Sequence, residues 1–437
     1  MCTLFSASIR GMIPTSPNRF AITMTKPVTY LVGGAVRDRL LGFPFSEKDW
    51  VVVGSTPEIM QQQGFNPVGK DFPVFLHPET KEEYALARTE RKTAPGYSGF
   101  TFHTAPDITL EEDLRRRDLT INAMAEDDHG TVIDPYHGQQ DLKDKLLRHV
   151  SDAFSEDPVR ILRTARFAAR YHHLGFRVAS ETNELMRNMV NNGEANHLVA
   201  ERVWKETERA LGEQSPWVFF QVLRDCDALQ VVFPELDNLF GVPQPEQHHP
   251  EIDTGVHSLM SLQQACRLSD DRQVRFAALV HDLGKASTPK EKWPRHIAHE
   301  ARSIPLINQL CERLAVPKHY REQARYVAQD HTNCHRIEEI TPPKLMALLQ
   351  RLDAFRRPEN LDKFVLACEA DARGRTGFEQ RPYPQADYLK QALAICNRIQ
   401  AKDIIAQGIT GKDIGDALKK QRQQALKQWK QQHESAN

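Results

Sequence analysis

Two acidic residues that follow a glycine pair are the first in the chain whose types and spacing could do chemistry. Glu47 and Asp49 stand just before or at the start of the apolar run Trp50–Val53, and Gly33-Gly34 closes an earlier apolar run. Two residues apart on an extended chain, the carboxylates project from the same face. Carboxylate oxygens are ligands that Mg²⁺ prefers, and glycines let backbone N–H groups approach phosphate closely. The pattern therefore predicts a Mg²⁺ site at Glu47 and Asp49, beside the phosphates of a nucleotide.

A third carboxylate and several arginines could complete such a site. Glu83 lies in the segment EYALAR, where it is either a further metal ligand or an ordinary exposed strand residue. Arg37 follows the glycines in the string GGAVRD, and Arg117 ends the arginine run in RRRDLTINA. Guanidinium groups match the geometry of phosphate oxygens. The arginines therefore favour a polyphosphate ligand, with a merely solvated charged surface as the alternative.

The stretch SEDPVRILRTARFAARYHHLGF predicts a helix with arginines along one face. We expect Ser155 to cap this helix and Gly175 to end it. Asp157 accepts hydrogen bonds and Arg160 donates them, so together they could mimic the Watson–Crick edge of a base. An exposed arginine stripe without a ligand is the alternative. Spacings of three and four residues place these arginines on one face: Arg160, Arg163, Arg166 and Arg170.

Histidines and aspartates gather in the second half of the chain. His281-Asp282 ends an apolar helical pattern in VRFAALVHDLGK. A lone histidine at a helix end is more often structural, but imidazole and carboxylate together bind divalent metals that activate water. His296 competes with His299, because both lie in the string RHIAH. The predicted metal ligands are His257, His281, Asp282, His299, His331 and Asp371.

Length and composition limit the number of domains, the kinds of partner and the location that we expect. The 437 residues suggest roughly three domains. The net charge of −1 means that a polyanion would have to bind a local basic surface. Seven cysteines without a CxxC pair indicate reduced thiols and a cytoplasmic location, not a disulfide framework. No apolar run approaches the ~20 residues of a membrane span, so we expect no membrane partner.

The elements that must position these residues change character along the chain. From Val28 to about Val150, short apolar runs typical of strands alternate with helical patterns, and after Pro135 the pattern is helical almost to the end. Thr93–His103 reads as a mobile loop near a substrate, and Val242–Pro250 reads as a domain joint. The sequence therefore predicts an α+β head followed by helical domains.

With these motifs in order, the chain resembles the bacterial tRNA nucleotidyltransferases that build the 3′-terminal CCA, in the multifunctional form with an HD domain. The resemblance runs from about Met24 almost to the C-terminus. It rests on LVGGAVRD, EKDWVVVG, EYALARTERK, RRRDLTINA, SEDPVRILRTARFAAR, HPEIDTG and HDLGK. It implies an α+β fold class: a polymerase-β-type nucleotidyltransferase head, an all-α neck and body, and an α-helical HD domain. The expected divisions are a disordered leader or misassigned start over 1–23, the head over 24–150, the neck and body over 151–241, the HD domain over 254–355 and a helical tail over 356–437.

By this resemblance, the head would add two CMP and one AMP to the 3′ end and acceptor arm of tRNA from CTP and ATP, with release of pyrophosphate and no nucleic-acid template. Glu47 and Asp49 would be the catalytic ligands of Mg²⁺. The family usually has Asp where Glu47 stands, so metal geometry and rate could differ here. By the resemblance, Gly34, Arg37 and Arg117 would hold the nucleotide, and Asp157 and Arg160 would read its base, with Arg163 and Arg166 nearby on the same helix face.

The HD domain would add a phosphohydrolase activity that depends on Ni²⁺ or Mg²⁺ and acts as a 2′,3′-cyclic phosphodiesterase, 2′-nucleotidase and phosphatase. Such a protein would be cytoplasmic and a monomer or homodimer. Three alternatives remain: a poly(A) polymerase, which shares the head motifs but generally lacks the HD segment; an HD phosphohydrolase with a degenerate head; and a non-catalytic tRNA-binding protein.

Overall fold

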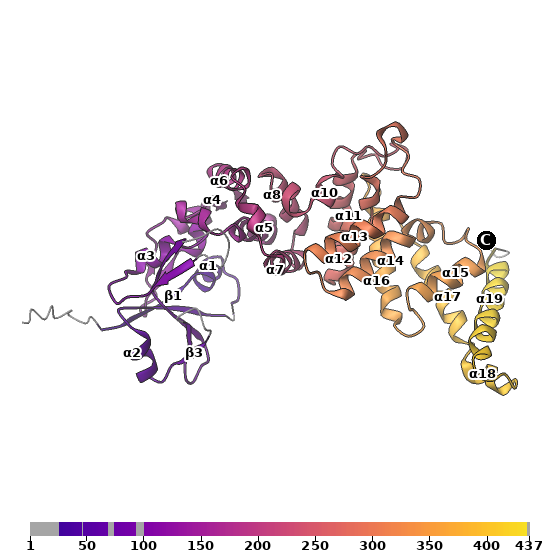
Figure 1. Cartoon of the computed structure of the whole chain (residues 1–437), viewed down its shortest axis with the longest axis horizontal. Helices are drawn as coiled ribbons and strands as arrows, with labels where there is room; N and C mark the ends of the chain where they lie inside the picture. Colours follow the sequence, from indigo (N-terminus) through magenta and orange to yellow (C-terminus); the bar gives the residue numbers. More distant parts are fainter. Residues whose placement is uncertain (1–25, 46, 69–73, 93–99, 435–437) are drawn as a thin grey trace, which may run out of the picture.

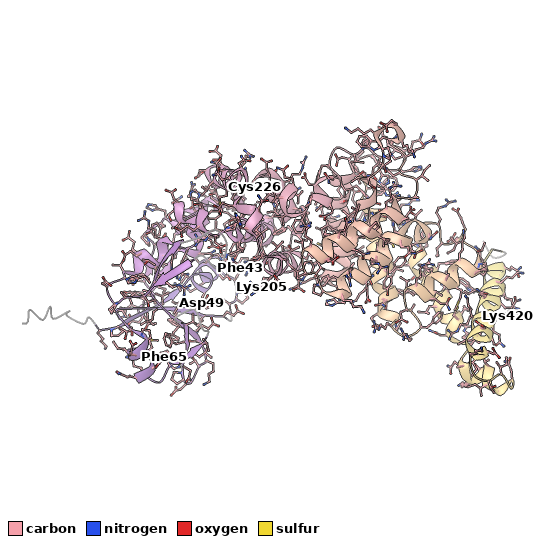
Figure 2. All side chains as sticks on the ribbon, viewed as in Figure 1. Phe43, Asp49, Phe65, Lys205, Cys226 and Lys420 are labelled. Atoms are coloured by element: carbon pink, nitrogen blue, oxygen red, sulfur yellow. The ribbon has the colours of Figure 1, made fainter. Side chains whose placement is uncertain are left out.

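The protein is elongated, with a mixed α/β head at one end and helices along the rest of its length (Figure 1). The structure, a computed structural model, describes residues 26–45, 47–68, 74–92 and 100–434. The leader expected over 1–23 lies outside these ranges. Asp49 in the head and Lys420 near the C-terminus lie toward opposite ends of the molecule (Figure 2). This arrangement agrees with the predicted fold class of an α+β head followed by helical domains.

A seven-stranded mixed sheet forms the head, in the order β3-β4-β5-β2-β1-β8-β9. Its central strands β1 and β2 are antiparallel, whereas β2 and β5 are parallel. The sheet strands are β1 (Val28–Val32), β2 (Asp49–Val53), β3 (Asn66–Val68), β4 (Val74–Leu76), β5 (Glu83–Leu86), β8 (Ala125–Glu126) and β9 (Val132–Ile133). Val52 packs with Met60, Phe75 and Leu86 on one side of the sheet, and Val51 packs with Ile108 and Leu114 on the other. Alternation along β2 therefore separates its two faces.

Four helices and a hairpin complete the head. A capping box at Thr109 and Glu112 begins α3. The prediction of a loop over Thr93–His103 is wrong for its last four residues, because Phe100–His103 forms strand β7, which pairs with β6. The rest of that segment, residues 93–99, lies outside the described ranges. Backbone pairing overrides the glycine-rich composition there. The elements are α1 (Gly34–Leu40), α2 (Pro57–Gln62), β6 (Thr89–Lys92), β7, α3 (Leu110–Arg115) and α4 (Gly138–Asp144).

The neck is built around α5 (Val159–Tyr171), which packs against α7 and α8. The prediction that Ser155 caps this helix is wrong. Ser155 lies in a 3₁₀ helix before α5, and its Oγ donates to Asp152 O. The Asp157 carboxylate instead accepts a hydrogen bond from Val159 N, at the start of α5. Pro158 holds the intervening position, so α5 begins later than predicted. The other short strands and helices are β10 (Leu146–Leu147), β11 (Arg177–Val178), α6 (Ser180–Asn191), α7 (Ala200–Leu211), α8 (Pro216–Asp225), α9 (Leu229–Val232) and α10 (Pro234–Asp237).

The remaining helices form a bundle and a tail. In the bundle, α11, α12, α14 and α16 pack against one another, and α19 closes the tail against α15 and α17. One continuous apolar core runs from Leu31 in the head to Leu426 in α19. The helices are α11 (Thr254–Leu268), α12 (Arg272–Val280), α13 (His299–Arg313), α14 (Lys318–His335), α15 (Pro342–Arg351), α16 (Pro358–Arg373), α17 (Gln385–Asn397), α18 (Ala401–Ala406) and α19 (Asp413–Glu434).

Two features bear on the environment of the protein. Six cysteines in the described ranges are free, five of them buried. Within those ranges no helix combines the length and apolar character needed to cross a bilayer.

Candidate functional site

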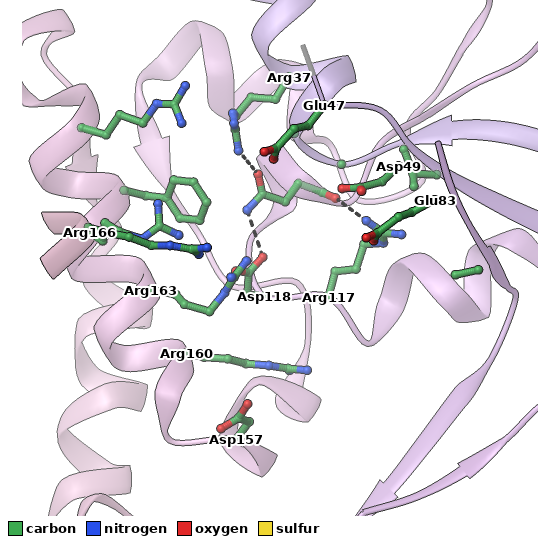
Figure 3. A pocket seen from close by; sticks show the side chains of 18 of the residues that line it. Arg37, Glu47, Asp49, Glu83, Arg117, Asp118, Asp157, Arg160, Arg163 and Arg166 are labelled. Carbon is green, nitrogen blue, oxygen red and sulfur yellow. Dashed lines mark hydrogen bonds and ion pairs between the residues drawn. The ribbon is translucent and has the colours of Figure 1, made fainter. Parts of the chain in front are cut away.

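A cavity of about 850 Å³ lies between the head sheet and helices α5 and α7. Among the described residues, eleven arginines and six acidic side chains line it, which gives this part of the cavity wall an excess of positive charge. Its walls include every predicted residue of the head site: Gly34, Arg37, Glu47, Asp49, Arg117, Asp157, Arg160, Arg163 and Arg166. The labelled side chains among them surround one space (Figure 3).

Three carboxylates enter this cavity from the sheet. The parallel register of β2 and β5 places Glu83 directly opposite Asp49, and Glu47 precedes β2 on the same face. On the opposite face, Trp50 Nε1 donates to Glu82 at 2.9 Å. Burial raises the pKa of Asp49 and the Glu47 charge adds to the rise, while Arg117 opposes it. A bound cation would relieve this repulsion, and a set of carboxylate oxygens suits Mg²⁺.

The glycine turn brings the backbone close to one of the arginines. Gly33 has a φ of 71°, which favours glycine, and a Cβ at this position would lie 2.9 Å from Arg117 Nη1. Arg117 is held by Asp113, whose carboxylate oxygen lies 3.2 Å from its Nη2. The glycine turn at the start of α1 and the Arg117 side chain therefore line the same cavity.

Asn122 connects Arg37 to Asp118 through a buried network. Its Oδ1 accepts from Arg37, and its Nδ2 donates to Asp118 at 3.0 Å. Arg163 Nε donates to the other oxygen of Asp118 at 2.7 Å. The network ties α1, the head and α5 together. Both Asp118 and Asn122 lie in the motif RRRDLTINA, but sequence reasoning gave them no role.

The side chains of the two residues predicted to read a base have different partners in this structure. Asp157 forms a two-pronged ion pair with Arg202 of α7, with N–O distances of 3.2 and 2.8 Å. Arg160 donates to the carbonyl oxygens of Ala153 and Arg116. Their side chains lie in the same cavity but are held separately, because a partner from α7 competes for the Asp157 carboxylate.

The arginine face of α5 is partly buried: Arg160 and Arg166 are buried, whereas the side chains of Arg163 and Arg170 are 36% and 37% exposed. Arg166 is 7% exposed, and its Nε donates to Glu206 at 2.7 Å. Arg170 pairs with Asp38 at 3.3 Å. These carboxylates compensate the mutual repulsion of the arginines, which allows guanidiniums to line the cavity at close spacing.

The six residues predicted as a second metal site come together in the helical bundle. His281 and Asp282 follow α12, His257 lies in α11, His299 begins α13, His331 lies in α14 and Asp371 lies in α16. Among the described residues, the groups whose ligand atoms lie within 4.8 Å of one another include His257–His281–Asp282, His281–His331–Asp371 and Asp282–His299–His331.

The donor set of this cluster fits a metal. Asp282 is buried, its Oδ2 lies 2.6 Å from Lys285 Nζ and 3.1 Å from His281 Nε2, and its Oδ1 lies 3.1 Å from His299 Nε2. Burial alone would raise the pKa of Asp282, but the charges of His281 and Lys285 hold that pKa well below its usual range. The carboxylate is therefore ionised in a buried site, where Lys285 compensates its charge and the surrounding imidazoles and carboxylates could hold a divalent metal.

The structure also separates the rival histidines of the RHIAH string. His296 Nδ1 lies 2.9 Å from Thr288 Oγ1 and its Nε2 lies 2.8 Å from Pro243 O, so both ring nitrogens are engaged away from the cluster. His299 Nε2 lies 3.1 Å from Asp282 Oδ1. This geometry favours His299 as the ligand.

Sequence reasoning gave no role to several residues that contact the cluster, among them Lys285, whose Nζ lies 2.6 Å from Asp282 Oδ2. Glu251 lies 3.1 Å from His257 Nδ1 and 2.9 Å from His249 Nδ1. His335 Nε2 lies 2.6 Å from Asp371 Oδ2. The string HPEIDTG contained Glu251 and His249, and the spacing of four residues from His331 to His335 on one helix could have indicated His335.

Family models match three parts of the chain. A "Poly A polymerase head domain" matches residues 29–148, a "Probable RNA and SrmB- binding site of polymerase A" matches residues 175–240, and an "HD domain" matches residues 254–367. Solved structures support the fold at low identity. A CCA-adding enzyme in complex with CTP matches with a TM-score of 0.61 and 21% identity over 92% of this chain and 87% of that chain. The Thermotoga maritima CCA-adding enzyme complexed with tRNA matches with a TM-score of 0.59 and 21% identity over the same shares.

Curated relatives are much closer in sequence. A multifunctional CCA protein of Thioalkalivibrio sulfidiphilus is 64% identical over 402 residues, which are 92% of this chain and 98% of the relative. The one from Teredinibacter turnerae is 61% identical over 91% of this chain and 97% of the relative. With the head, the helical body and the HD domain in the same order, the chain belongs to the family of multifunctional CCA proteins, the CCA-adding tRNA nucleotidyltransferases that carry an HD domain.

Proposed function

We propose that this protein adds and repairs the 3′-terminal CCA of tRNA without a nucleic-acid template, using CTP and ATP and releasing pyrophosphate. The observation that carries the proposal is the meeting of the β2 and β5 carboxylates with an arginine-lined cavity of about 850 Å³. The names of the curated relatives and the CTP, ATP and tRNA complexes of structural relatives agree with it.

Different residues that line the cavity would bind the metal ion and the nucleotide. Glu47 and Asp49, with Glu83 beside them, would hold Mg²⁺, which supplies activation of the attacking tRNA 3′-hydroxyl and charge compensation on the triphosphate. The Gly34 backbone, Arg37 and Arg117 would hold the phosphates and sugar. Because the protein binds the charged groups in a rigid frame, it would align the 3′-hydroxyl with the α-phosphate.

The base would be read on the α5 side of the same cavity. Asp157 and Arg160 would contact the base edge, with Arg163 and Arg166 nearby. Since Asp157 is paired with Arg202 and Arg160 with backbone carbonyls, a nucleotide would have to exchange these contacts for its own. A change in those exchanges as the tRNA end grows would account for the switch from CTP to ATP.

The decisive experiment is extension of tRNA that lacks its last three nucleotides, with Mg²⁺ and with CTP and ATP together or separately. We expect a single CCA after sequencing of the 3′ ends. A long A tract from ATP alone would instead identify a poly(A) polymerase, and no extension would mean that the head is a scaffold. Recognition of the tRNA backbone on the helical domains predicts that tRNA binding weakens as salt rises.

We further propose that the HD cluster is a metal-dependent phosphohydrolase of 2′,3′-cyclic phosphates, 2′-nucleotides and phosphate monoesters, using Ni²⁺ or Mg²⁺. The buried Asp282 carboxylate and the four imidazoles gathered around it support it. Release of phosphate from these substrates, measured with each metal in turn, tests the activity. We expect the protein to act in the cytoplasm as a monomer or homodimer, which fractionation and light scattering would examine.

A further inference from the structure

One side of the head cavity is formed by helices of the neck and of the HD domain. Arg209 lies near the end of α7, and Arg272 begins α12, which lies in the part of the chain matched as an HD domain. Arg272 is exposed and the Arg209 side chain is 51% exposed, whereas the Arg166 side chain in the same cavity is 8% exposed. The two arginines therefore belong to the solvent-facing rim of the cavity, and the proposed nucleotide site uses neither of them.

The guanidinium of Arg272 lies beside the backbone at the end of α7. Gly212 makes room for it, because a Cβ at this position would lie 2.7 Å from Arg272 Nε and 2.8 Å from its Nη2. Within the described ranges Arg272 makes no hydrogen bond and no ion pair. Burial raises the pKa of Glu213, and the charge of Arg272 is among those that oppose this rise, but the Glu213 carboxylate is paired with Arg166 at 3.7 Å. The positive charge of Arg272 is therefore available to a ligand.

Arg209 shares its carboxylate with another arginine. Its Nη1 lies 3.8 Å from Glu206 Oε1, while Glu206 Oε2 accepts from Arg166 Nε at 2.7 Å. One carboxylate thus faces two guanidiniums, and the ion pair of the more exposed one contributes little in water. Arg209 and Arg272 therefore carry positive charge that the described carboxylates of the rim compensate only in part. Guanidiniums of this kind suit phosphate oxygens.

Two phosphate-bearing molecules enter this cavity in the proposed reaction. The nucleotide would occupy the residues already assigned to it, with its base at the start of α5 and its phosphates at the glycine turn of α1. The other molecule is the tRNA acceptor strand, whose 3′-hydroxyl has to reach the α-phosphate from the solvent side of the cavity. Exposed arginines on that side suit contacts to the backbone phosphates of a strand that enters and leaves in every cycle.

We propose that Arg272 and Arg209 bind backbone phosphates of the tRNA acceptor strand, so that the HD domain supplies part of the RNA-binding surface of the head. The inference rests on the proposed CCA addition and adds to it the side on which the RNA enters. A phosphate contact carries no sequence information, so these arginines serve every tRNA alike and do not distinguish CTP from ATP. Because α12 packs against α7, the placement of the HD domain against the neck determines the position of the Arg272 guanidinium.

Equilibrium binding of tRNA that lacks its last three nucleotides tests this role without relying on catalysis. Fluorescence anisotropy gives the dissociation constant of the full chain and its variants at a series of salt concentrations. We expect Arg272→Gln to raise the dissociation constant about 3–10-fold and to reduce the slope of its logarithm against log salt by about 0.7–0.9, because one phosphate contact is lost. Arg272→Lys should keep the parent slope, since it keeps the charge. The affinity for CTP should be unchanged in both variants.

Two further variants complete the comparison. Arg209→Gln should weaken tRNA binding and reduce the slope in the same way as Arg272→Gln. Arg267→Gln, which changes an exposed arginine of α11 outside the cavity, is the matched control and should bind tRNA like the parent. The parent slope in Arg272→Gln, or equal losses in Arg272→Gln and Arg267→Gln, would overturn the proposal. Lost affinity for CTP or pyrophosphate with unchanged tRNA binding would overturn it too and would assign Arg272 to the nucleotide.

The RNA contact and the proposed CCA addition fail in different ways. If the parent binds this tRNA but adds no nucleotide to it, CCA addition is contradicted, and the slopes of the variants still decide the RNA contact. If the parent adds CCA while Arg272→Gln keeps the parent slope and the parent KM for tRNA, CCA addition stands and the RNA contact is refuted.

Discussion

Asp118 joins the head to α5 through one buried carboxylate. It accepts from Arg163, Asn122 and its neighbour Leu119 N. Burial alone would raise the pKa of Asp118, but the Arg163 charge and these hydrogen bonds hold that pKa well below its usual range. The native state thus binds a proton less readily than the unfolded chain, and the carboxylate stabilises the fold above the ordinary Asp pKa of about 3.9.

We expect Asp118→Asn to lower stability by about 2–4 kcal/mol near pH 7, since it leaves a network of buried donors without their charged acceptor. The difference from the parent should stay constant down to about pH 5 and shrink below about pH 4, where the unfolded parent takes up its proton. Calorimetry across this range measures it. Asp128→Asn at an exposed position is the matched control. A difference that grows toward acid pH would contradict the assignment.

The Asp157–Arg202 pair suggests how nucleotide choice is controlled. Asp157→Ala removes an acceptor from the proposed base-reading edge, so discrimination between CTP and ATP should fall by roughly tenfold or more. Incorporation rates for each nucleotide on tRNA ending in CC and in C measure this ratio. Asp152→Ala, an exposed carboxylate in the preceding 3₁₀ turn, should leave the ratio unchanged. Unaltered selectivity in Asp157→Ala would exclude a role in base reading.

At the residue scale, motifs located the side chains but not their partners. Glu47, Asp49 and Arg117 could be placed near one another from strand and turn patterns, and the structure puts them in one cavity. The pairing of Asp157 with Arg202, 45 positions later, depends on how α5 packs against α7, which no local pattern encodes. The same holds for Asp371 and His335, which meet only through the packing of α14 against α16.

At the scale of elements, the register of β2 and β5 determines which carboxylates meet. Parallel pairing sets Asp49 opposite Glu83, so Glu83 enters the cavity with the two predicted ligands. We expect Glu83→Gln to slow nucleotidyl transfer roughly 10–100-fold, because it removes a charge next to the metal site. Single-turnover kinetics at saturating CTP measure the chemical step. Glu79→Gln, an exposed residue of the turn before β5, is the control. A normal rate would make Glu83 an ordinary strand residue.

Helices and strands differed in how well the sequence specified them. Five apolar runs predict strands, and β1, β2, β4, β5 and β9 match them within one residue at each end: Val28–Val32, Trp50–Val53, Val74–Leu76, Tyr84–Ala87 and Thr131–Ile133. Strand β7 was missed because its pairing with β6 is a tertiary contact, whereas the sequence there is rich in glycine. Helix α5 starts later in the chain than predicted, because a 3₁₀ helix and Pro158 occupy the positions where the cap at Ser155 was expected. Short elements with little periodicity of their own depend on their neighbours.

At the scale of the whole molecule, one helix connects the two proposed sites. Arg272 at the start of α12 lines the head cavity, and His281 directly follows its last residue. The neck and the bundle also share a continuous apolar core. The two centres are therefore mechanically joined, although their side chains do not overlap: no residue of the HD cluster lines the head cavity.

This arrangement predicts that the activities are separable. We expect His281→Ala to lower phosphate release from 2′,3′-cyclic nucleotides by at least roughly 100-fold, since it deletes a ligand of the proposed metal centre. CCA addition should stay within about twofold of the parent, because the variant leaves Arg272 and the rest of the cavity in place. Both rates are measured on one preparation, with His319→Ala as the control and the unfolding midpoint as a check on folding. Loss of both activities in a folded His281→Ala chain would mean that the HD centre supports the head through α12, and the domain would then be structural.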